Sequence, residues 1–322
     1  MFVLEFQVPG FKFRVSVEKV MILKKHFGTR LMKVEVRSIE SGAYVLSYFI
    51  FLLMANISEQ KIVVVCDFSE RMKAVIVHGV QMAGILKKEL CLTAIWKKMD
   101  QKASIQEKLN HATMTIKQNL PDMKVSSLLL MNSLHENIEK LIMEYDAVLV
   151  ILHQADIKFA LKAFRISSVA FLFVNNDSSE FLNYKNVLVP VDYRKASKEA
   201  ALWASFLGRF NRSVVQVVYA HEKNKDQSEE IMKNLNFFKK FLSSLKVSHH
   251  LIAGKSSSWG ICNETIANAH KWKGDVMVFT GSTYISLIDL LIGLPERKII
   301  RKAGNLPIIM INPRKEICML CD

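Results

Sequence analysis

"NVLVPVDYRKASKEAALWASFLGRF" (186–210) decides the fold of this 322-residue chain. It opens with an apolar run, the pattern of a parallel strand that is buried on both faces. The run ends in Asp192, and an amphipathic stretch of about fifteen residues follows, which predicts a helix. A buried strand followed by a helix is how a βαβ unit begins, although this one lies past the middle of the chain.

The same pattern occurs earlier, in "KIVVVCDFSERMKAVIVHGVQMAGILKKELCLTAIW" (61–96). Asp67 corresponds to Asp192, an offset of 192 − 67 = 125 positions. The same offset carries Trp96 onto His221, at the end of a second predicted strand in each copy. An offset that is shared over the whole segment indicates a duplication.

Both copies continue in the same way. Further helices are predicted at 106–120 and 134–145, and at 228–245 and 263–272. Further strands are predicted at 124–131, 146–152 and 169–175, and at 246–254, 275–281 and 306–312. Strands that alternate with helices form parallel sheets with helices on both faces. We therefore expect two tandem doubly wound α/β domains, each with a five-stranded parallel sheet, at 58–177 and 186–315, with a linker at 178–185 and a tail at 316–322.

Residues 1–57 lie outside the repeat. The apolar run at 43–55 is interrupted only by Ser47, but it is shorter than the roughly 20 residues of a membrane-spanning helix. Residues 11–18 alternate like a strand without an evident partner. Three interpretations stay open: a membrane-surface anchor, a poorly ordered extension, or a stretch that is absent from the natural protein, which would then begin at Met54.

The composition and charge of the chain indicate which class of protein it belongs to. Half of the residues are hydrophobic and 23% are charged, as in a globular chain. The formal net charge of +14 favours anionic partners in general, or reflects only a solvated basic surface. Five scattered cysteines argue against a disulfide scaffold and predict a reducing, cytoplasmic compartment. Cys318 and Cys321 have the C-x-x-C spacing, but no second pair completes a zinc site.

The two copies differ in the loop after the fourth strand. Asp146 and Asn175 are 29 positions apart, whereas Asp275 and Asn312 are 37 apart, so the second copy is 37 − 29 = 8 residues longer. In a doubly wound sheet this loop lies at the carboxyl ends of the strands, where ligands bind.

The longer loop carries the candidate ligand groups. Gly281 directly follows the strand, Ser282 and Thr283 come next, and Gly293 lies further along. A glycine lets backbone N–H groups approach a phosphate closely, and hydroxyls add donors. The alternative is that both glycines only form turns around a packed apolar helix.

The strand–Asp–aromatic openings, "DVMVFTGS" (275–282) and "RKAGNLPIIMINP" (301–313) resemble the universal stress protein family, and the duplication resembles its tandem members. The resemblance covers about residues 60 to 315. It implies a fold related to the adenine-nucleotide alpha-hydrolases, with pairing through the fifth strands. We therefore expect an intramolecular pseudo-dimer, while a homodimer and unknown protein partners stay open.

ATP-binding members of that family carry Gly-x-x-Gly, nine residues, then Gly-Ser/Thr. The first glycine matches Gly281, the second falls on Tyr284, and the last falls on Gly293 if one deletion is allowed. Tyr284 places a side chain where the backbone must come close, and Leu294 replaces the hydroxyl residue. These departures put ATP binding in doubt. The loop of the first copy (153–165) has no glycine, which implies that this copy has lost the phosphate site.

The resemblance nevertheless assigns a site to the second domain. It places an adenine nucleotide such as ATP, with magnesium, near Asp192, and its phosphates near the loop. The predicted phosphate contacts are Gly281, Ser282, Thr283 and Gly293, with Lys255 in a supporting role.

No catalytic constellation accompanies these residues. The chain contains neither H-E-x-x-H nor G-x-S-x-G, and Asp67 and Asp192 are expected to cap the helices that follow them. We expect a stress-response binding protein, not an enzyme, without metal site, nucleic-acid specificity or membrane attachment. The alternatives are a ligand-free interaction scaffold and, more weakly, a slow ATPase.

Overall fold

The computed structural model describes residues 60–176, 183–282 and 295–313, together with three strands near the N-terminus. These strands are β1 (Phe2–Val8), β2 (Phe11–Lys25) and β3 (Thr29–Val36), and they form an antiparallel sheet in the order β1-β2-β3. The strand expected at 11–18 therefore has partners on both sides. Residues 1–60 form one unit and residues 61–322 another.

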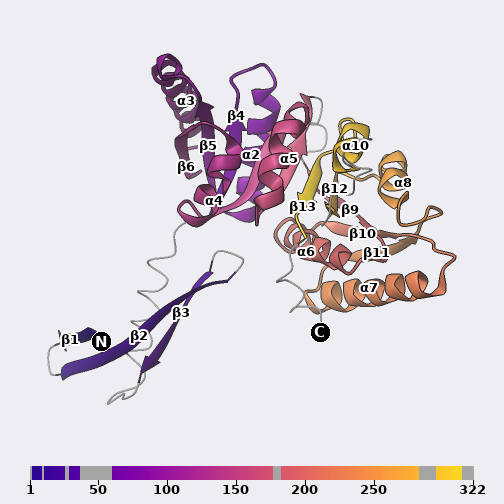
Figure 1. The fold of residues 1–322 in the computed structure, drawn as a ribbon, viewed down its shortest axis with the longest axis horizontal. Coiled ribbons are helices and arrows are strands. Elements are labelled where there is room, and N and C mark those ends of the chain that lie inside the picture. The colour runs from indigo at the N-terminus through magenta and orange to yellow at the C-terminus, as the bar shows by residue number, and fades with distance from the viewer. Residues whose placement is uncertain are drawn as a thin grey trace. The chain divides into compact units, whose positions relative to one another are not determined.

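The second unit contains two copies of the same series of elements (Figure 1). The first copy contains β4 (Lys61–Cys66), α2 (Met72–Leu86), β5 (Glu89–Trp96), α3 (Met99–Asn119), β6 (Val125–Met131), α4 (Leu134–Met143), β7 (Ala147–His153), α5 (Ile157–Ile166) and β8 (Ala170–Val174). The second contains β9 (Asn186–Val191), α6 (Ala200–Asn211), β10 (Val214–Tyr219), α7 (Lys225–Ser244), β11 (His249–Ala253), α8 (Ile261–Ala267), β12 (Val276–Thr280), α10 (Pro295–Lys302) and β13 (Ile308–Ile311).

All ten strands belong to one sheet, in the order β11-β10-β9-β12-β13-β8-β7-β4-β5-β6. Each copy thus has the order third, second, first, fourth, fifth. Neighbouring strands are parallel except for β13 and β8, which pair antiparallel with Ile309 opposite Leu172. The expected pair of doubly wound domains is confirmed, and the two fifth strands join them as a pseudo-dimer.

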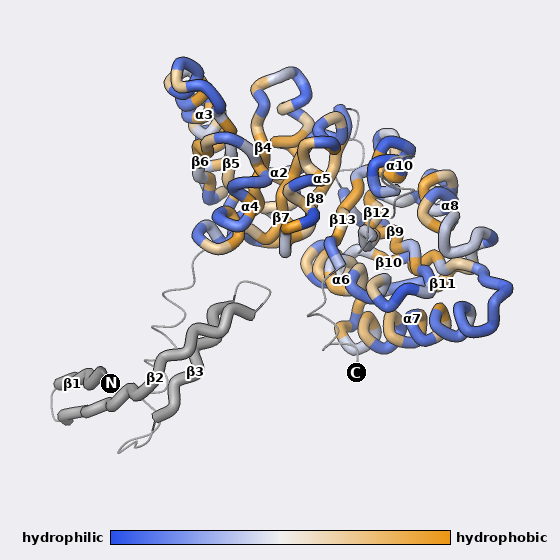
Figure 2. The backbone as a smooth tube through the Cα atoms, viewed as in Figure 1, coloured by the Kyte–Doolittle hydropathy of each residue, from blue (hydrophilic) through white to orange (hydrophobic). Residues whose placement is uncertain are grey.

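The strands of the ten-stranded sheet are mostly hydrophobic, which explains why the sheet is buried on both faces (Figure 2). Val187, Val189 and Val191 of β9 lie in the hydrophobic core on the side of α2, α3, α6 and α7. Leu188 and Met277 belong to the core on the side of α4, α5 and α10. Alternate strand residues therefore fill two cores, as expected for apolar runs without polar interruptions.

An asparagine bridges the two copies at each side of their junction. Asn312, just after β13, donates from Nδ2 to the carbonyl oxygens of Phe164, Arg165 and Ser167, at 3.1, 3.1 and 2.8 Å. These carbonyls lie at the C-terminal end of α5 in the other copy. Asn175, just after β8, correspondingly donates toward the carbonyl oxygen of Gly304 at 3.4 Å.

Among the helices in the described ranges, none is both long and apolar enough to cross a membrane.

Candidate functional site

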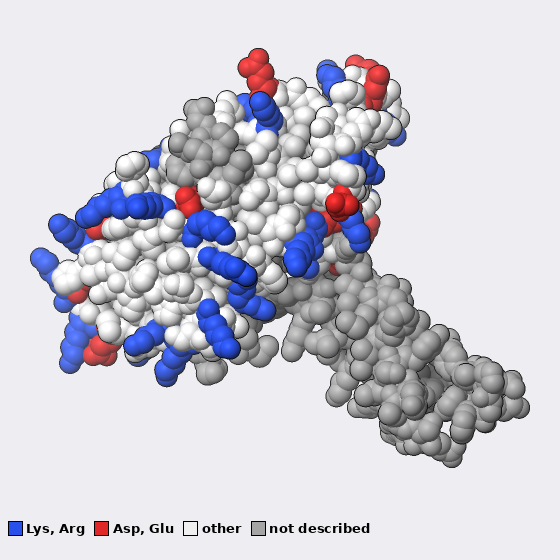
Figure 3. All heavy atoms as spheres, turned by 180° about the vertical axis from the view of Figure 1, so that it is seen from behind, with Lys and Arg blue, Asp and Glu red and all other residues white. Residues whose placement is uncertain are grey.

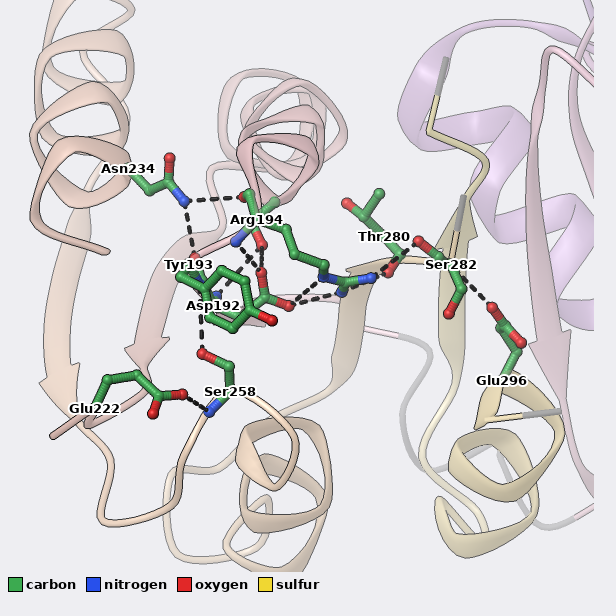
Figure 4. Close-up of polar contacts among 11 residues, drawn as sticks. Asp192, Tyr193, Arg194, Glu222, Asn234, Ser258, Thr280, Ser282 and Glu296 are labelled. Carbon is green, nitrogen blue, oxygen red and sulfur yellow. Dashed lines mark hydrogen bonds and ion pairs between the residues drawn. The ribbon is translucent and has the colours of Figure 1, made fainter. Parts of the chain in front are cut away.

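The candidate site lies at the carboxyl ends of β9 and β12. β9 stands between β10 and β12, so the strand order reverses at this point. Doubly wound sheets bind ligands in the crevice at such a reversal. Asp192 follows β9, and Gly281 and Ser282 follow β12, so the fold brings these three sequence-predicted residues to the strand-order reversal, which we call the crevice. Figure 4 shows Asp192 and Ser282 on either side of Arg194.

Asp192 is buried, and its carboxylate is fully engaged by the turn that follows it. Oδ1 accepts from the Ser197 hydroxyl at 2.6 Å and from the Arg194 backbone N–H at 2.8 Å. Oδ2 accepts from Arg194 Nε at 2.8 Å and forms an ion pair with Nη2 at 2.6 Å. The expectation that Asp192 caps the next helix is therefore corrected: it organises the turn before α6, which begins without a side-chain cap.

Arg194 crosses the crevice from one strand end to the other. Its Nη1 points to the carbonyl oxygen of Gly281 and its Nη2 to that of Thr280, each at 3.4 Å. Burial alone would lower the pKa of the guanidinium, but the charge of Asp192, the hydrogen bonds to it and smaller contributions from Cys262 and Glu296 together raise it. The guanidinium therefore stays charged and occupies the place where the strand order reverses.

The turn is also held from behind by α7. The buried side chain of Asn234 donates from Nδ2 to the backbone oxygens of Asp192, at 2.8 Å, and Arg194, at 3.0 Å. These bonds fix the path of the backbone that carries both charged groups (Figure 4). The crevice is thus a preorganised part of the fold, since its members are fixed by other elements.

The side of the crevice where the sequence predicted phosphate contacts contains a carboxylate. The Ser282 backbone N–H donates to Glu296 Oε1 at 2.6 Å, and the Gly281 N–H donates to the Ile311 carbonyl at 2.8 Å. Glu296 comes from the first turn of α10 and is 4% exposed. A backbone amide that the sequence assigned to a phosphate therefore binds an internal anion.

The missing side chain of Gly281 has a packing role. A Cβ there would lie 3.2 Å from Phe164 Cε1 and 3.5 Å from Glu296 Oε1. Phe164 belongs to α5 of the first copy, so the glycine allows a close approach across the junction. This contact accounts for Gly281 without any ligand.

Lys255 is placed apart from the crevice. It is exposed, and it follows β11, which is separated from β9 by β10. Its backbone N–H donates to both carboxylate oxygens of Glu264, at 2.9 and 3.0 Å. The remaining candidate positions, Thr283 and Gly293, and the departures at Tyr284 and Leu294, lie outside the described residues.

Asp67 in the first copy has similar hydrogen-bond partners, although its side chain is exposed whereas that of Asp192 is buried. It accepts from the Ser69 backbone N–H at 3.0 Å and from Arg71 Nη2 at 3.0 Å. Burial opposes ionisation, but the bonds from Ser69 and the charge of Arg71 hold the pKa of Asp67 below its usual value. α2 also begins without a side-chain cap, so the capping expectation is corrected here too.

Two of these groups were missed by sequence reasoning. Arg194 is two residues after the strand-end aspartate, and Glu296 lies in the first turn of α10. The sequence signal that could have identified them is a charged residue close to a predicted ligand-binding residue. In the part of the chain that the structure describes, no three His, Cys, Asp or Glu side chains are placed to hold a metal ion.

Comparisons with known proteins support the fold. No protein-family model and no curated protein matches the chain. A universal stress protein from Archaeoglobus fulgidus is similar in structure, with a TM-score of 0.62 and 12% identity over 79% of this chain and 98% of that one. A protein of unknown function from Pseudomonas aeruginosa has a TM-score of 0.56 and 15% identity over 82% and 96%. Because these alignments cover more of the chain than one repeat, the chain has the fold of the universal stress proteins in its tandem, two-domain form.

Proposed function

We propose that the chain is a universal-stress-type binding protein of the cytoplasm that acts in the stress response through protein contacts, with its second-copy crevice filled by its own side chains. The observation that carries the proposal is the 2.6 Å bond from the Ser282 N–H to the buried Glu296 carboxylate. A phosphate at this amide has to displace Glu296 and tolerate any carboxylate that stays nearby. Like charges at such a distance repel strongly in a buried site.

The adenine side supports the same conclusion. Asp192 accepts four bonds from the Arg194 backbone, the Arg194 guanidinium and the Ser197 hydroxyl. An adenine amino group could bind Asp192 only if one of these donors moved away. Since the guanidinium also lies against the end of β12, the crevice of the free protein is filled by its own side chains.

The second candidate function is adenine-nucleotide binding in the second copy. Two groups favour it: the Ser282 amide and the Arg194 guanidinium are a donor and a cation at the strand-order reversal. If Glu296 swings out, the Ser282 amide becomes available to the phosphates of ATP with magnesium, and Arg194 can join it by leaving the carbonyls of Thr280 and Gly281. Under either candidate we propose binding without turnover.

Thermal unfolding with and without magnesium-ATP separates the two. We expect no change in the melting temperature of the wild-type protein at millimolar ATP. A ligand at a hundred times its Kd adds about 2.7 kcal/mol. For a unit of this size that corresponds to an increase of roughly 5–10 °C.

The decisive variant is Glu296→Ala. It removes the internal anion from Ser282, so we expect this variant to acquire an ATP-dependent increase that the wild type lacks. Glu264→Ala is the matched control, since it removes a carboxylate that binds backbone amides in a different loop. A wild-type increase that Gly281→Val abolishes would establish nucleotide binding instead, and phosphate release above background would establish an ATPase.

A further inference from the structure

β11 is an end strand of the ten-stranded sheet. On its inner side, Gly254 N donates to the Tyr219 carbonyl at 2.8 Å, and the Ser248 carbonyl accepts from Val215 N at 2.9 Å. Since strand residues alternate, the backbone N–H of Leu251 points away from β10. No strand in the described ranges pairs with that outer side. Such an edge is a template for another extended segment.

An exposed tryptophan stands at the carboxyl end of this strand. Trp259 lies in the loop between β11 and α8 and is 86% exposed. The loop is tightly held: Glu264 accepts from Ser256 N at 2.6 Å, and Glu222 accepts from Ser258 N at 2.7 Å. A large aromatic group on a fixed loop loses little entropy on binding, which is why tryptophan dominates many protein interfaces.

The surroundings of the edge are positively charged. From residue 231 to residue 263 the sequence has no Asp or Glu, and its lysines are Lys233, Lys239, Lys240, Lys246 and Lys255, of which Lys233 is paired with Glu230. The next acidic residue, Glu264, is turned onto the loop amides. α7, which carries three of these lysines, packs against β11. Lys and Arg side chains also outnumber acidic ones on the face shown in Figure 3.

We propose that β11 and Trp259 form a docking site for an extended, acidic segment of a partner protein. The segment pairs with the outer edge of β11 and places an apolar or aromatic side chain on Trp259. Edge pairing supplies main-chain hydrogen bonds, and the tryptophan and lysines supply specificity. The inference rests on the proposed function, since it specifies how the protein contacts are made.

Two other kinds of partner fit less well. The residues before Trp259 are three serines, so the loop offers one apolar side chain, which is little area for membrane insertion. Single-stranded nucleic acid binds by stacking successive bases on several aromatic groups. Among the described residues, Trp259 is the sole exposed large aromatic side chain between β11 and α8.

The test is fluorescence anisotropy with a fluorescein-labelled random copolymer of glutamate and tyrosine, titrated with the full chain. We expect binding that is tighter than to polyglutamate, and a loss of about 30-fold or more in Trp259→Ala. Leu251→Pro removes an outward N–H but leaves the pairing with β10, so it should also weaken binding. Leu251→Ala keeps that N–H and should bind more tightly than Leu251→Pro.

Met114→Ala is the control, because Met114 is a 63% exposed residue on α3 of the first copy. Melting temperatures show whether each variant is folded, and Trp259→Ala keeps the test decisive if Leu251→Pro unfolds. Equal affinity of Trp259→Ala and wild type overturns the proposal, as does no copolymer binding. Trp259-dependent binding to phosphatidylserine vesicles or oligothymidylate in preference to the copolymer also overturns it. These outcomes leave the ATP result untouched, since that result depends on the crevice between β9 and β12.

Discussion

Asn312 should stabilise the junction between the two copies. Its Nδ2 has two hydrogens and faces three carbonyl oxygens of the other copy, at 3.1, 3.1 and 2.8 Å. Two hydrogen bonds at about 1 kcal/mol each amount to about 2 kcal/mol, which Asn312→Ala removes. Because 1 kcal/mol shifts the melting temperature of a unit of this size by about 2–4 °C, we expect a decrease of about 4–8 °C.

Asn312→Asp provides the sharper comparison. The introduced carboxylate has the same shape, but it directs negative charge at the carbonyls of Phe164, Arg165 and Ser167. We expect a larger decrease than in Asn312→Ala at neutral pH, and partial recovery at acidic pH, where the protonated group can donate again. The assay is differential scanning calorimetry at both pH values. Unchanged melting temperatures in both variants, or an Asn312→Asp protein as stable as wild type, would refute this account of the junction.

Two further predictions concern buried and loop-bound groups. Burial raises the pKa of the Cys66 and Cys262 thiols to about 12 each, so alkylation of the folded protein at about pH 8 should leave both unlabelled, and peptide mass spectrometry should find the label only after denaturation. Rapid native labelling of Cys262, which is only partly buried, would contradict its raised pKa. Burial opposes ionisation of Glu264, but bonds from Lys255 and Ser256 hold its pKa below the usual value. The stabilisation by Glu264 is therefore complete above the pKa of the unfolded state and is lost as pH falls through the lower folded value. Hydrogen exchange should show the protection of the Ser256 amide disappearing over that range, whereas Glu264→Gln should show no such step.

The sequence predicts most of the fold because the fold depends on local patterns. Apolar runs ending in Asp67 and Asp192, each followed by a helical period, specify two series of βαβ units, and the structure has both. The joining of the two sheets through β8 and β13 was predicted only from the family resemblance, since nothing in the sequences of these two strands specifies that they pair with each other. The pairing of β1, β2 and β3 was missed because an alternating pattern predicts a strand but not the strand that pairs with it.

The crevice was predicted only in its position. Gly281 and Ser282 lie where the topology places them, but what fills the crevice depends on side chains from separate elements. Arg194 could equally have pointed into solvent, and its direction is decided by Asp192 together with the carbonyls of Thr280 and Gly281, almost ninety positions further along. Glu296 in the first turn of α10 is typical of a residue that favours its own helix N-terminus. It binds Ser282 instead, because β12 ends beside α10.

A comparison of Asp67 with Asp192 indicates that a strand-end aspartate alone is no evidence for nucleotide binding. Asp67 belongs to the copy whose loop has no glycine, yet it is paired with an arginine just as Asp192 is. The arginines occupy different positions, four residues after Asp67 and two after Asp192, so the pairing is not a simple copy of one ancestral contact. An aspartate that keeps the same role beside two different arginines, in one copy with a glycine loop and one without, is explained by the turn that it stabilises. Nucleotide binding in the second copy therefore has to be judged at Ser282 and Glu296, where the copies differ.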